Sequence, residues 1–553
     1  MISKLQIKQG TKENPSVIDI DVSKPTIFVG PNNSGKSLLL REIQEYLSTA
    51  SSENFLLVNN IDVQEFSEEE ILKAIDTIRV PSSRHDTTTN IPVKKPIVYG
   101  GNYDMRDIHW PHISNYLANS SDEMNKRYFL EQFYSLFILR LDGRTRFALT
   151  EPTPSADLSG PSMNHLMSLF QNDEYREELR NIIYDALGIY FVIDPTGMNE
   201  FRIRFSKRAP KSTTEEQSLD QESREFHKNA INILDMSDGV KAFTGILSSM
   251  FSFNYKTILV DEPEAFLHPP LARKLGLRLT QLSNKKIANL LMATHSSNFV
   301  MGCIESGLEV NIVRLTYNND VASSKVLDHK DLLTLMKDPL LRSTGVISSL
   351  FHEKVIITEA DADRSFYQEI NLRMIEKNNR GVKDCLFLNA QNKQTTSRIM
   401  KPLKDLGIPV ASILDIDVIK EGGTNWTNLL KGAHIPEELH SSLNNLRQSV
   451  KKSFENTGKD MKRDGGVELL KDGEQVAFWS LADQLAQYGV FIVPGGELES
   501  WLSYLGIGKN KSTWLTHMFE ALGSDPTSEE YVKPREEEDV WKFTSSIADW
   551  FDN

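Results

Sequence analysis

The sequence predicts an α/β protein made of two successive sheet-and-helix domains, and three observations support this prediction. Residues 30–37 read GPNNSGKS and lie between a strand-like apolar run and a helix-like run. From residue 229 onward, strand-like and helical segments alternate, which is the pattern of α/β folds. A second series of this kind begins near Lys354. We therefore predict one domain over residues 1–347 and another over 348–553.

Length and composition are those of an ordinary globular protein. The 553 residues are 39% hydrophobic and 25% charged, which is enough for two to four domains with their own cores. The two cysteines, Cys303 and Cys385, exclude a disulfide framework or a cysteine-rich zinc site. There is no signal peptide pattern and no apolar run near the roughly 18 residues of a membrane span. We expect a cytoplasmic protein without a membrane segment.

The segment at residues 30–37 is a complete phosphate loop of the form GxxxxGK[ST]. Its backbone N–H groups and the following helix N-terminus are suited to phosphate oxygens. Lys36 is expected to reach the β- and γ-phosphates of a nucleoside triphosphate, and the Ser37 hydroxyl to bind Mg²⁺. The loop residues expected to surround the phosphates are Gly30, Asn32, Asn33, Ser34 and Gly35.

The remaining elements of the first domain are predicted from apolar periodicity and turn residues. Residues 2–20 are typical of two strands joined by a turn. Residues from about 60 to 228 are expected to form a large, mainly helical insertion that includes a short β pair at 188–205. The polar, charge-mixed run at 206–218 is predicted to be a solvated or mobile loop.

Two later strands end in residues that suit triphosphate hydrolysis. An apolar strand ends at Asp261 and Glu262, where Asp261 can hold Mg²⁺ and Glu262 can orient the attacking water. The next strand ends at His295, a candidate γ-phosphate sensor, although a core or capping histidine has the same pattern. Between the loop and these strands, Ser237 and Gly239 form a Ser-x-Gly turn before a helix, which is an anion-binding arrangement.

These four motifs, in this order, resemble the ABC-type ATPase head. The resemblance implies ATP as the nucleotide and places Ser237 and Gly239 over the nucleotide of a neighbouring chain, so it implies a homodimer or a higher homo-oligomer. The metal-contacting glutamine of that family has no match that we can assign.

The second domain carries carboxylates at three strand ends. Although a net charge of −14 argues mildly against non-specific nucleic-acid coating, a metal-dependent nuclease itself needs clustered acids. In a parallel sheet, strand ends meet at one edge, and converging carboxylates suit Mg²⁺ or Mn²⁺. Each acid alone is more typical of a helix cap or an exposed turn. The acids are Glu359, Asp363, Asp415, Asp417, Glu497 and Glu499.

This set resembles the TOPRIM domain, a parallel-sheet, Rossmann-like fold of topoisomerases, primases and certain nucleases. The resemblance implies Glu359, Asp415 and Asp417 as metal ligands and Asp363 as a supporting acid. The chain departs from the family pattern at Ala360, where glycine is usual.

An ATPase head followed by TOPRIM resembles the OLD (overcoming lysogenization defect) family of ATP-regulated nucleases. The resemblance implies that Glu497 or Glu499 completes a second metal site and that Lys509 or Lys511 is a catalytic lysine. Family members often act in bacterial anti-phage defence, some with a partner protein and some in retron operons. The resemblance therefore implies DNA as the substrate. It also implies a partner, which is a reverse transcriptase, another defence protein or an RNA/DNA hybrid.

The sequence thus predicts an ATP-regulated, metal-dependent DNA endonuclease. The alternative is an ATP-switched DNA-binding or scaffolding protein whose TOPRIM domain is not catalytic. An insertion at about 420–480 in the second domain contains the basic stretches 447–452 and 459–463, which are candidate contacts to backbone phosphates, although charge runs are usually solvated faces.

Overall fold

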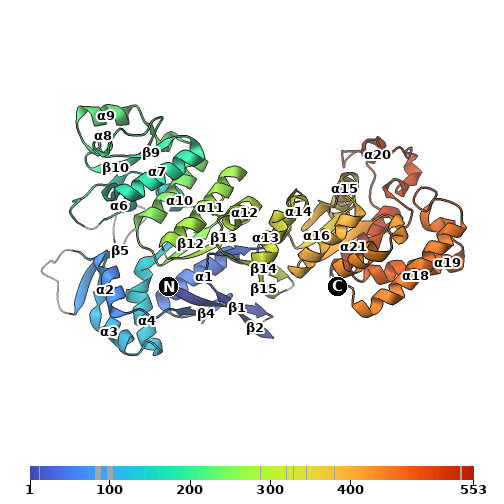
Figure 1. The fold of residues 1–553 in the computed structure, drawn as a ribbon, viewed down its shortest axis with the longest axis horizontal. Coiled ribbons are helices and arrows are strands. Elements are labelled where there is room, and N and C mark those ends of the chain that lie inside the picture. The colour runs from blue at the N-terminus through green and yellow to red at the C-terminus, as the bar shows by residue number, and fades with distance from the viewer. Residues whose placement is uncertain are drawn as a thin grey trace. The chain divides into compact units, whose positions relative to one another are not determined.

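The computed structural model describes residues 1–11, 13–80, 89–95, 104–143, 145–160, 162–286, 288–318, 320–327, 329–343, 345–378, 380–535 and 538–552. The chain divides into two compact units, Met1–His329 and Lys330–Asn553, which are coloured blue to yellow-green and yellow to red in Figure 1. The boundary that the sequence predicted after residue 347 lies inside the second unit. Within the described residues, no helix combines the length and the apolar character that a membrane span requires.

A nine-stranded mixed sheet forms the centre of the first unit. Its order is β2-β1-β15-β14-β3-β13-β12-β7, and β4 pairs with β1. The strands from β14 to β7 run parallel, whereas β1, β2, β4 and β15 pair antiparallel. The strands are β1 (Ile2–Gly10), β2 (Pro15–Asp21), β3 (Thr26–Val29), β4 (Val58–Val63), β7 (Ile138–Leu141), β12 (Thr257–Asp261), β13 (Asn289–Ala293), β14 (Asn311–Asn318) and β15 (Val321–Leu327).

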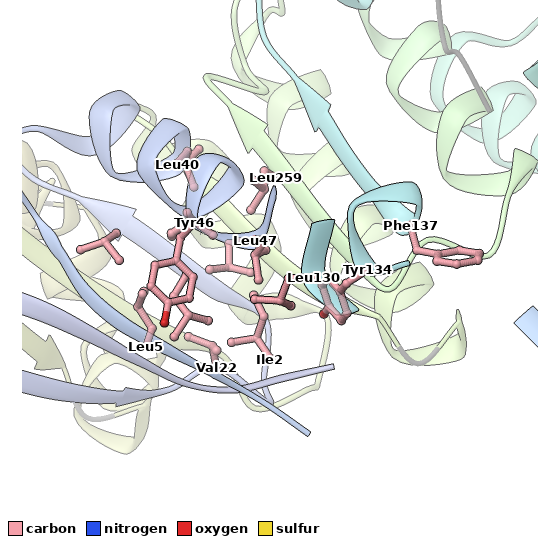
Figure 2. Close-up of a cluster of buried hydrophobic side chains, with 14 of the residues drawn as sticks. Ile2, Leu5, Val22, Leu40, Tyr46, Leu47, Leu130, Tyr134, Phe137 and Leu259 are labelled. Carbon is pink, nitrogen blue, oxygen red and sulfur yellow. The ribbon is translucent and has the colours of Figure 1, made fainter. Parts of the chain in front are cut away.

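Helix α1 (Lys36–Thr49) follows the phosphate loop and packs its apolar face on this sheet. Leu40, Tyr46 and Leu47 point into a cluster with Ile2 and Leu5 of β1, as Figure 2 shows. Buried residues recur every three or four positions along α1, which is the spacing of one helical face. This packing fixes the N-terminus of α1, and with it Lys36, at the end of β3. Helix α11 (Pro269–Lys286) contacts β13, and both α10 (Asp238–Ser252) and α12 (Ser297–Glu305) pack against α11.

The insertion predicted at 60–228 contains strands as well as helices. One of these strands, β7, belongs to the central sheet, so the insertion is interrupted rather than continuous. The β pair predicted at 188–205 is present as antiparallel β9 and β10. The elements are α2 (Glu68–Asp76), β5 (Asn90–Lys95), β6 (Asp104–His109), α3 (Trp110–Ala118), α4 (Glu123–Gln132), η1 (Tyr134–Phe137), α5 (Thr145–Ala148), β8 (Thr153–Pro154), α6 (His165–Gln171), α7 (Asp173–Leu187), β9 (Tyr190–Asp194), β10 (Glu200–Ser206), α8 (Thr213–Gln217), α9 (Gln221–Lys228), β11 (Ile231–Asn232) and η2 (Ile233–Asp235).

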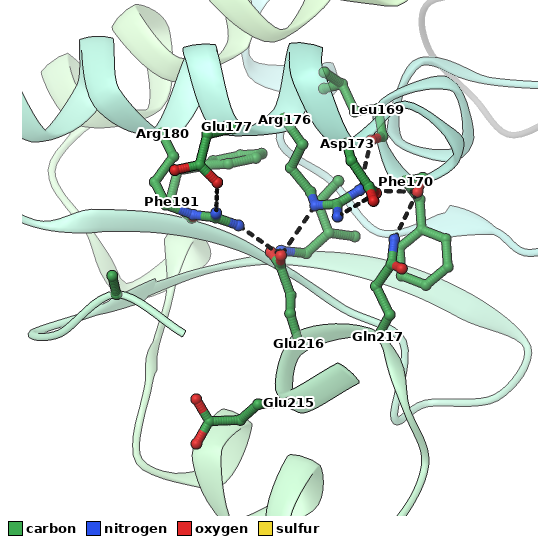
Figure 3. Close-up of polar contacts among 12 residues, drawn as sticks. Leu169, Phe170, Asp173, Arg176, Glu177, Arg180, Phe191, Glu215, Glu216 and Gln217 are labelled. Atoms are coloured by element: carbon green, nitrogen blue, oxygen red, sulfur yellow. Dashed lines mark hydrogen bonds and ion pairs between the residues drawn. The ribbon is translucent and has the colours of Figure 1, made fainter. Parts of the chain in front are cut away.

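The prediction of a solvated loop at 206–218 is wrong for its second half. Residues 213–217 form α8, and the side chain of Glu216 is only 1% exposed. Its Oε2 accepts hydrogen bonds from Arg176 Nε at 2.9 Å and Arg180 Nη2 at 2.5 Å, while Oε1 accepts one from the N–H of Ile193 at 3.1 Å (Figure 3). The polar composition therefore serves a buried ion-pair network that ties α8 to α7 and β9.

Replacing Glu216 by alanine is expected to lower the free energy of unfolding of this region by about 3–5 kcal/mol, because two buried guanidinium groups lose their carboxylate. Chemical denaturation followed by circular dichroism would measure the change. The matched control is Glu177→Ala, since Glu177 pairs with Arg180 but is 65% exposed. Equal effects of the two substitutions would contradict the role assigned to burial.

The second unit is built on a four-stranded sheet, β17-β16-β18-β19, in which all strands run parallel. Three helices lie between β18 and β19 in the chain, over the range of the insertion predicted at 420–480. The elements are α13 (His329–Lys337), α14 (Pro339–Ser343), η3 (Val346–Phe351), β16 (Lys354–Thr358), α15 (Asp361–Asn378), β17 (Cys385–Asn389), α16 (Lys393–Asp405), β18 (Val410–Leu414), η4 (Ile416–Lys420), α17 (Gly423–Gly432), α18 (Glu437–Asn456), η5 (Gly466–Leu469), α19 (Asp472–Ala486), β19 (Val490–Ile492), η6 (Leu498–Ser500), η7 (Ser503–Leu505), α20 (Trp514–Leu522) and α21 (Asp539–Asp552).

Candidate nucleotide and metal sites

The phosphate loop turns sharply between β3 and α1. Gly30 and Gly35 have φ angles of 144° and 89°, and a Cβ at Gly30 would lie 2.0 Å from the carbonyl oxygen of Leu315. Glycine is thus required by both the backbone conformation and the close approach of β14. The loop residues Asn32, Asn33 and Ser34 lie between the two glycines. The geometry places N–H groups of a helix N-terminus at the end of a parallel strand, an arrangement suited to phosphate binding.

Lys36 is buried beneath this loop. Its Nζ donates to the carbonyls of Gly30 and Pro31 at 2.8 and 2.7 Å and to Ser34 Oγ at 3.1 Å. Burial lowers the pKa of Lys36 to about 8, although the charges of Glu262 and Asp261 oppose that shift. The ammonium group is therefore held inside the loop, close to the strand-end acids.

Ser37 and Asp261 meet although they lie far apart in sequence. Ser37 Oγ donates to Asp261 Oδ1 at 2.9 Å. Burial raises the pKa of Asp261, and the Ser37 hydroxyl partly offsets this effect. The order β3-β13-β12 brings the ends of these parallel strands to one edge. The hydroxyl and the carboxylate predicted to hold Mg²⁺ are therefore adjacent.

Glu262 and His295 also come together at this edge. His295 Nε2 lies 3.8 Å from Glu262 Oε1. Burial lowers the pKa of His295, and the charge of Lys36 adds to that shift, which favours the neutral imidazole. The backbone N–H of His295 donates to the Glu264 carboxylate at 2.7 Å, so the strand end is anchored to the turn after β12. The candidate water-orienting acid and the candidate sensor are thus neighbours.

Arg146 is a residue of this site that sequence reasoning missed. Its guanidinium donates to the carbonyls of Asp261 and Glu262 at 2.8 and 2.9 Å, and the residue is 1% exposed. Glu262 has a φ of 49°, in the left-handed region that non-glycine residues rarely adopt. Arg146 therefore supports the backbone that carries both acids. It lies 115 residues before Asp261 in no recognisable motif, so no local signal could have identified it.

Arg146→Met is expected to reduce the turnover number of ATP hydrolysis by about a hundredfold, because a shift of roughly 1 Å in a catalytic group has that effect. Nucleotide affinity should change little, since Arg146 touches backbone rather than the phosphate loop. Steady-state ATPase assays and nucleotide titration would separate the two, with Arg202→Met as a distant arginine control. Parallel losses in affinity and turnover would contradict this positioning role.

Ser237 and Gly239 lie at the N-terminus of α10, where Ser237 is the N-cap residue. A Cβ at Gly239 would lie 2.8 Å from the carbonyl oxygen of Phe266, so glycine allows the turn after β12 to approach this helix. Among hydrogen bonds of the described residues, none joins Ser237 to the phosphate loop of the same chain. The contact of this turn with a neighbouring chain's nucleotide stays a prediction.

Three carboxylates of the second unit converge at the carboxyl edge of its parallel sheet. Ligand atoms of Glu359, Asp415 and Asp417 all lie within 4.8 Å of one another. Glu359 follows β16 and Asp415 follows β18, and Glu359 Oε1 accepts a hydrogen bond from the Asp415 N–H at 2.9 Å. Adjacent parallel strands thus create the cluster that the sequence predicted from their ends.

The electrostatics of this cluster favour an added cation. Burial raises the pKa of Glu359 to about 8, and the neighbouring Asp415 carboxylate adds to the shift. Burial and the same charge raise the pKa of Asp363 to about 7. Asp363 Oδ2 accepts a hydrogen bond from the N–H of Ala360 at 2.8 Å, so this turn forms with alanine at position 360. Crowded carboxylates of this kind are stabilised by a bound metal ion.

The third strand end contributes Glu497 and Glu499, both largely buried. Their charges act on the first cluster, since Glu497 contributes to the raised pKa of Asp415 and Glu499 to that of Asp363. Glu497 Oε2 accepts an ion-pair hydrogen bond from Lys511 Nζ at 2.6 Å. Of the two candidate lysines, Lys511 is therefore the one whose contact with a site acid the structure records; Lys509 is two residues away.

Two further lysines contact the cluster, and neither was predicted in that role. Lys393 Nζ lies 3.0 Å from Asp417 Oδ2, and Lys462 Nζ lies 2.5 Å from Asp415 Oδ2. Lys462 belongs to the basic stretch 459–463, a candidate phosphate contact for which a solvated face was the alternative. In the other stretch, Arg447 is buried and donates to the Ile419 carbonyl at 2.9 Å, so that side chain has a structural role.

Two family models match the chain. Residues 103–301 match the family described as "AAA domain, putative AbiEii toxin, Type IV TA system", and residues 350–417 match "Overcoming lysogenization defect protein-like, TOPRIM domain". The second match contains Glu359, Asp363, Asp415 and Asp417. No curated protein matches the chain.

Solved structures with partial similarity include SMC head domains and ATP-binding cassettes of ABC transporters. They include an Smc head bound to the C-terminal winged-helix domain of ScpA (13% identity, 60% of this chain and 99% of that chain, TM-score 0.35). The SMC head domain from Thermotoga maritima matches at 15% identity over 59% of this chain and 99% of that chain, with a TM-score of 0.30. An ABC-transporter ATP-binding cassette in its ADP conformation matches at 16% identity over 62% and 98%, with a TM-score of 0.25.

These TM-scores are low, so the assignment depends on the family models and the geometry. The first unit has the phosphate loop, strand-end acids and mixed sheet of an ATPase head, and the second has the parallel sheet and carboxylates of TOPRIM. The matched ATPase domain precedes the matched TOPRIM domain. The chain thus joins an ATPase domain to a C-terminal OLD-like TOPRIM domain, and this combination supports an OLD-family ATPase–TOPRIM protein.

Proposed function

We propose that this protein is an ATP-regulated, divalent-metal-dependent endonuclease that cleaves DNA. The observation that carries the proposal is the convergence of Glu359, Asp415 and Asp417, with ligand atoms within 4.8 Å of one another. These acids lie inside the matched TOPRIM segment.

The residues around the cluster fit a hard divalent cation. Glu359, Asp415 and Asp417 would hold Mg²⁺ or Mn²⁺ with Asp363 in support, because carboxylate oxygens are the ligands such ions prefer. Glu497 or Glu499 would complete a second site. A bound cation supplies positive charge for a phosphate group and acidifies a water molecule. Lys511, paired with Glu497 at 2.6 Å, is our candidate for the catalytic lysine.

ATP is proposed to bind at the first unit and to control cleavage. Lys36 would contact the β- and γ-phosphates, and Ser37 and Asp261 would hold the magnesium ion. Glu262 would orient the attacking water, and His295 would contact the γ-phosphate. Ser237 and Gly239 of a neighbouring chain would close over the nucleotide, so the active form is a homodimer or a higher homo-oligomer.

The biological setting that we propose is anti-phage defence in the bacterial cytoplasm. The OLD-like TOPRIM match supports this proposal because the family that the sequence resembles often acts in such defence. A defence-system partner, such as a retron reverse transcriptase with its RNA/DNA hybrid, would supply the trigger.

A plasmid-cleavage assay with purified protein tests the proposed function. Reactions with Mg²⁺, Mn²⁺ or EDTA, each with and without ATP, should show nicking or linearisation only when a divalent ion is present. Cleavage that persists in EDTA, or DNA binding without cleavage under every condition, would favour the ATP-switched DNA-binding protein instead.

A further inference from the structure

Lys462 places its ammonium group directly on the candidate metal ligands. Its Nζ lies 2.5 Å from Asp415 Oδ2 and 3.8 Å from Asp417 Oδ2. The side chains of Lys462 and Asp415 are 22% and 14% exposed, so solvent screens this pair less than a surface ion pair. Lys462 lies between α18 and η5, within the helical insertion rather than on the parallel strands.

The turn that carries Lys462 is held in place on both sides. Asp460 Oδ1 accepts the Lys462 N–H at 2.8 Å, and Asp464 Oδ2 accepts the Asp460 N–H at 2.8 Å. A Cβ at Gly496 would lie 2.2 Å from the Lys462 carbonyl oxygen, and one at Gly466 would lie 2.1 Å from that of Pro494. The insertion is thus pressed against the loop that follows β19 and leads to Glu497. The hydrogen bonds and packing of this turn therefore position Lys462 beside Asp415.

The second lysine at the cluster has a different environment. Lys393 Nζ lies 3.0 Å from Asp417 Oδ2 and 3.2 Å from Glu421 Oε1, so it divides its contacts between the cluster and an acid outside it. Both ion pairs of Lys462 recorded for the described residues are with acids of the cluster. Lys393→Met is therefore a matched control, because it removes a positive charge near the cluster without removing the contact with Asp415.

An ammonium group and a divalent cation compete for the same carboxylate oxygen. A nitrogen 2.5 Å from Asp415 Oδ2 takes up space beside an oxygen that Mg²⁺ would need to approach to about 2.0–2.1 Å. Two positive charges at such a distance repel each other. A metal ion can use this oxygen fully only after the ammonium group has moved away.

We propose that Lys462 is a tethered competitor of the metal ion, and that a phosphodiester group of the substrate becomes its new partner when the metal binds. Metal and substrate then bind cooperatively, because each favours the state in which Lys462 has left Asp415, and this coupling is reciprocal. The proposal rests on the proposed nuclease function, since it uses the same carboxylates and a phosphodiester substrate.

Mn²⁺ binding to the full-length protein, without nucleotide or DNA, tests the competition independently of cleavage. By isothermal titration calorimetry, Lys462→Met should bind Mn²⁺ on the order of tenfold more tightly than the wild type, and Lys393→Met should differ by less than about threefold. Thermal unfolding in EDTA checks that each variant is folded, and Lys462→Gln replaces Lys462→Met if the latter is not.

An unchanged or weaker affinity in the folded Lys462 variant would overturn the proposal, as would an equal gain in Lys393→Met. If no variant binds Mn²⁺, the wild type included, the metal site of the proposed function is refuted together with its competitor. If Mn²⁺ binds tightly and with the same affinity to the wild type and the Lys462 variant, only the role of Lys462 as a competitor is refuted.

A non-cleavable phosphorothioate DNA duplex tests the second half of the proposal. Added in excess, the duplex should raise the Mn²⁺ affinity of the wild type on the order of tenfold and that of Lys462→Met much less. The reason is that the variant has no ammonium group that could move from Asp415 to a phosphodiester. Equal effects of the duplex on both proteins would show that Lys462 does not couple metal to phosphate and would overturn that step.

Discussion

Glu359→Gln is expected to reduce metal-dependent DNA cleavage at least about a hundredfold while ATP hydrolysis continues. Loss of even an indirect partner of metal ligands typically reduces affinity or activity 10–100-fold, and Glu359 is proposed as a direct ligand. Glutamine keeps the size of the side chain and can still accept the Asp415 N–H, so the local fold should persist. Plasmid cleavage and phosphate release, measured on the same preparation, report the two activities separately.

The matched control is Asp361→Asn, which removes an acid two residues from Glu359. Asp361 lies in the first turn of α15, is 69% exposed and pairs with Arg364, outside the carboxylate cluster. This variant should cleave DNA like the wild type. If Glu359→Gln and Asp361→Asn cleave equally well, the cluster is not the site of cleavage, and the TOPRIM domain has a binding or scaffolding role.

The parts of both sites that lie at strand ends were predictable from sequence. A phosphate loop after β3 and paired acids after β12 lie at one edge because parallel strands align their carboxyl ends. The same reasoning brought Glu359 and Asp415 together from separate strands, and the structure places their ligand atoms within 4.8 Å. The positions of such residues follow from the order of the strands and helices. Apolar periodicity in the sequence reveals that order.

Residues that reach a site from an insertion were not predictable in this way. Arg146 contacts the Asp261 carbonyl across 115 residues, and its role depends on how α5 packs rather than on any local pattern. Lys462 lies in a charged stretch whose composition is also typical of a solvated face, and only the close packing at Gly496 directs it to Asp415. Glu216 was misassigned for the same reason, because a polar run does not show that two arginines of α7 will enclose it.

Lys36→Met is expected to reduce ATP hydrolysis on the order of 10²–10³-fold, the typical effect of removing one group that stabilises transition-state charge. The Lys36 ammonium group is buried beneath the loop and donates to two loop carbonyls and to Ser34 Oγ. Its burial lowers the pKa to about 8, so a phosphate that approaches finds a weakly solvated cation. Methionine fills similar space without the charge. Phosphate release and nucleotide titration would measure the loss.

The Lys36→Met variant also tests whether ATP bound to the head regulates DNA cleavage, when cleavage is compared with and without ATP. If the head regulates the TOPRIM site, DNA cleavage by Lys36→Met in ATP should equal cleavage by the wild type without nucleotide, whichever direction the regulation takes. Lys24→Met is the control, because Lys24 precedes β3 and pairs with Glu309 at 2.9 Å, with its side chain 38% exposed. It should keep both ATP hydrolysis and the response to ATP. The Lys36→Met substitution removes a positive charge at the phosphate loop alone. If DNA cleavage by Lys36→Met still responds to ATP as cleavage by the wild type does, the regulatory nucleotide acts at a site other than this loop.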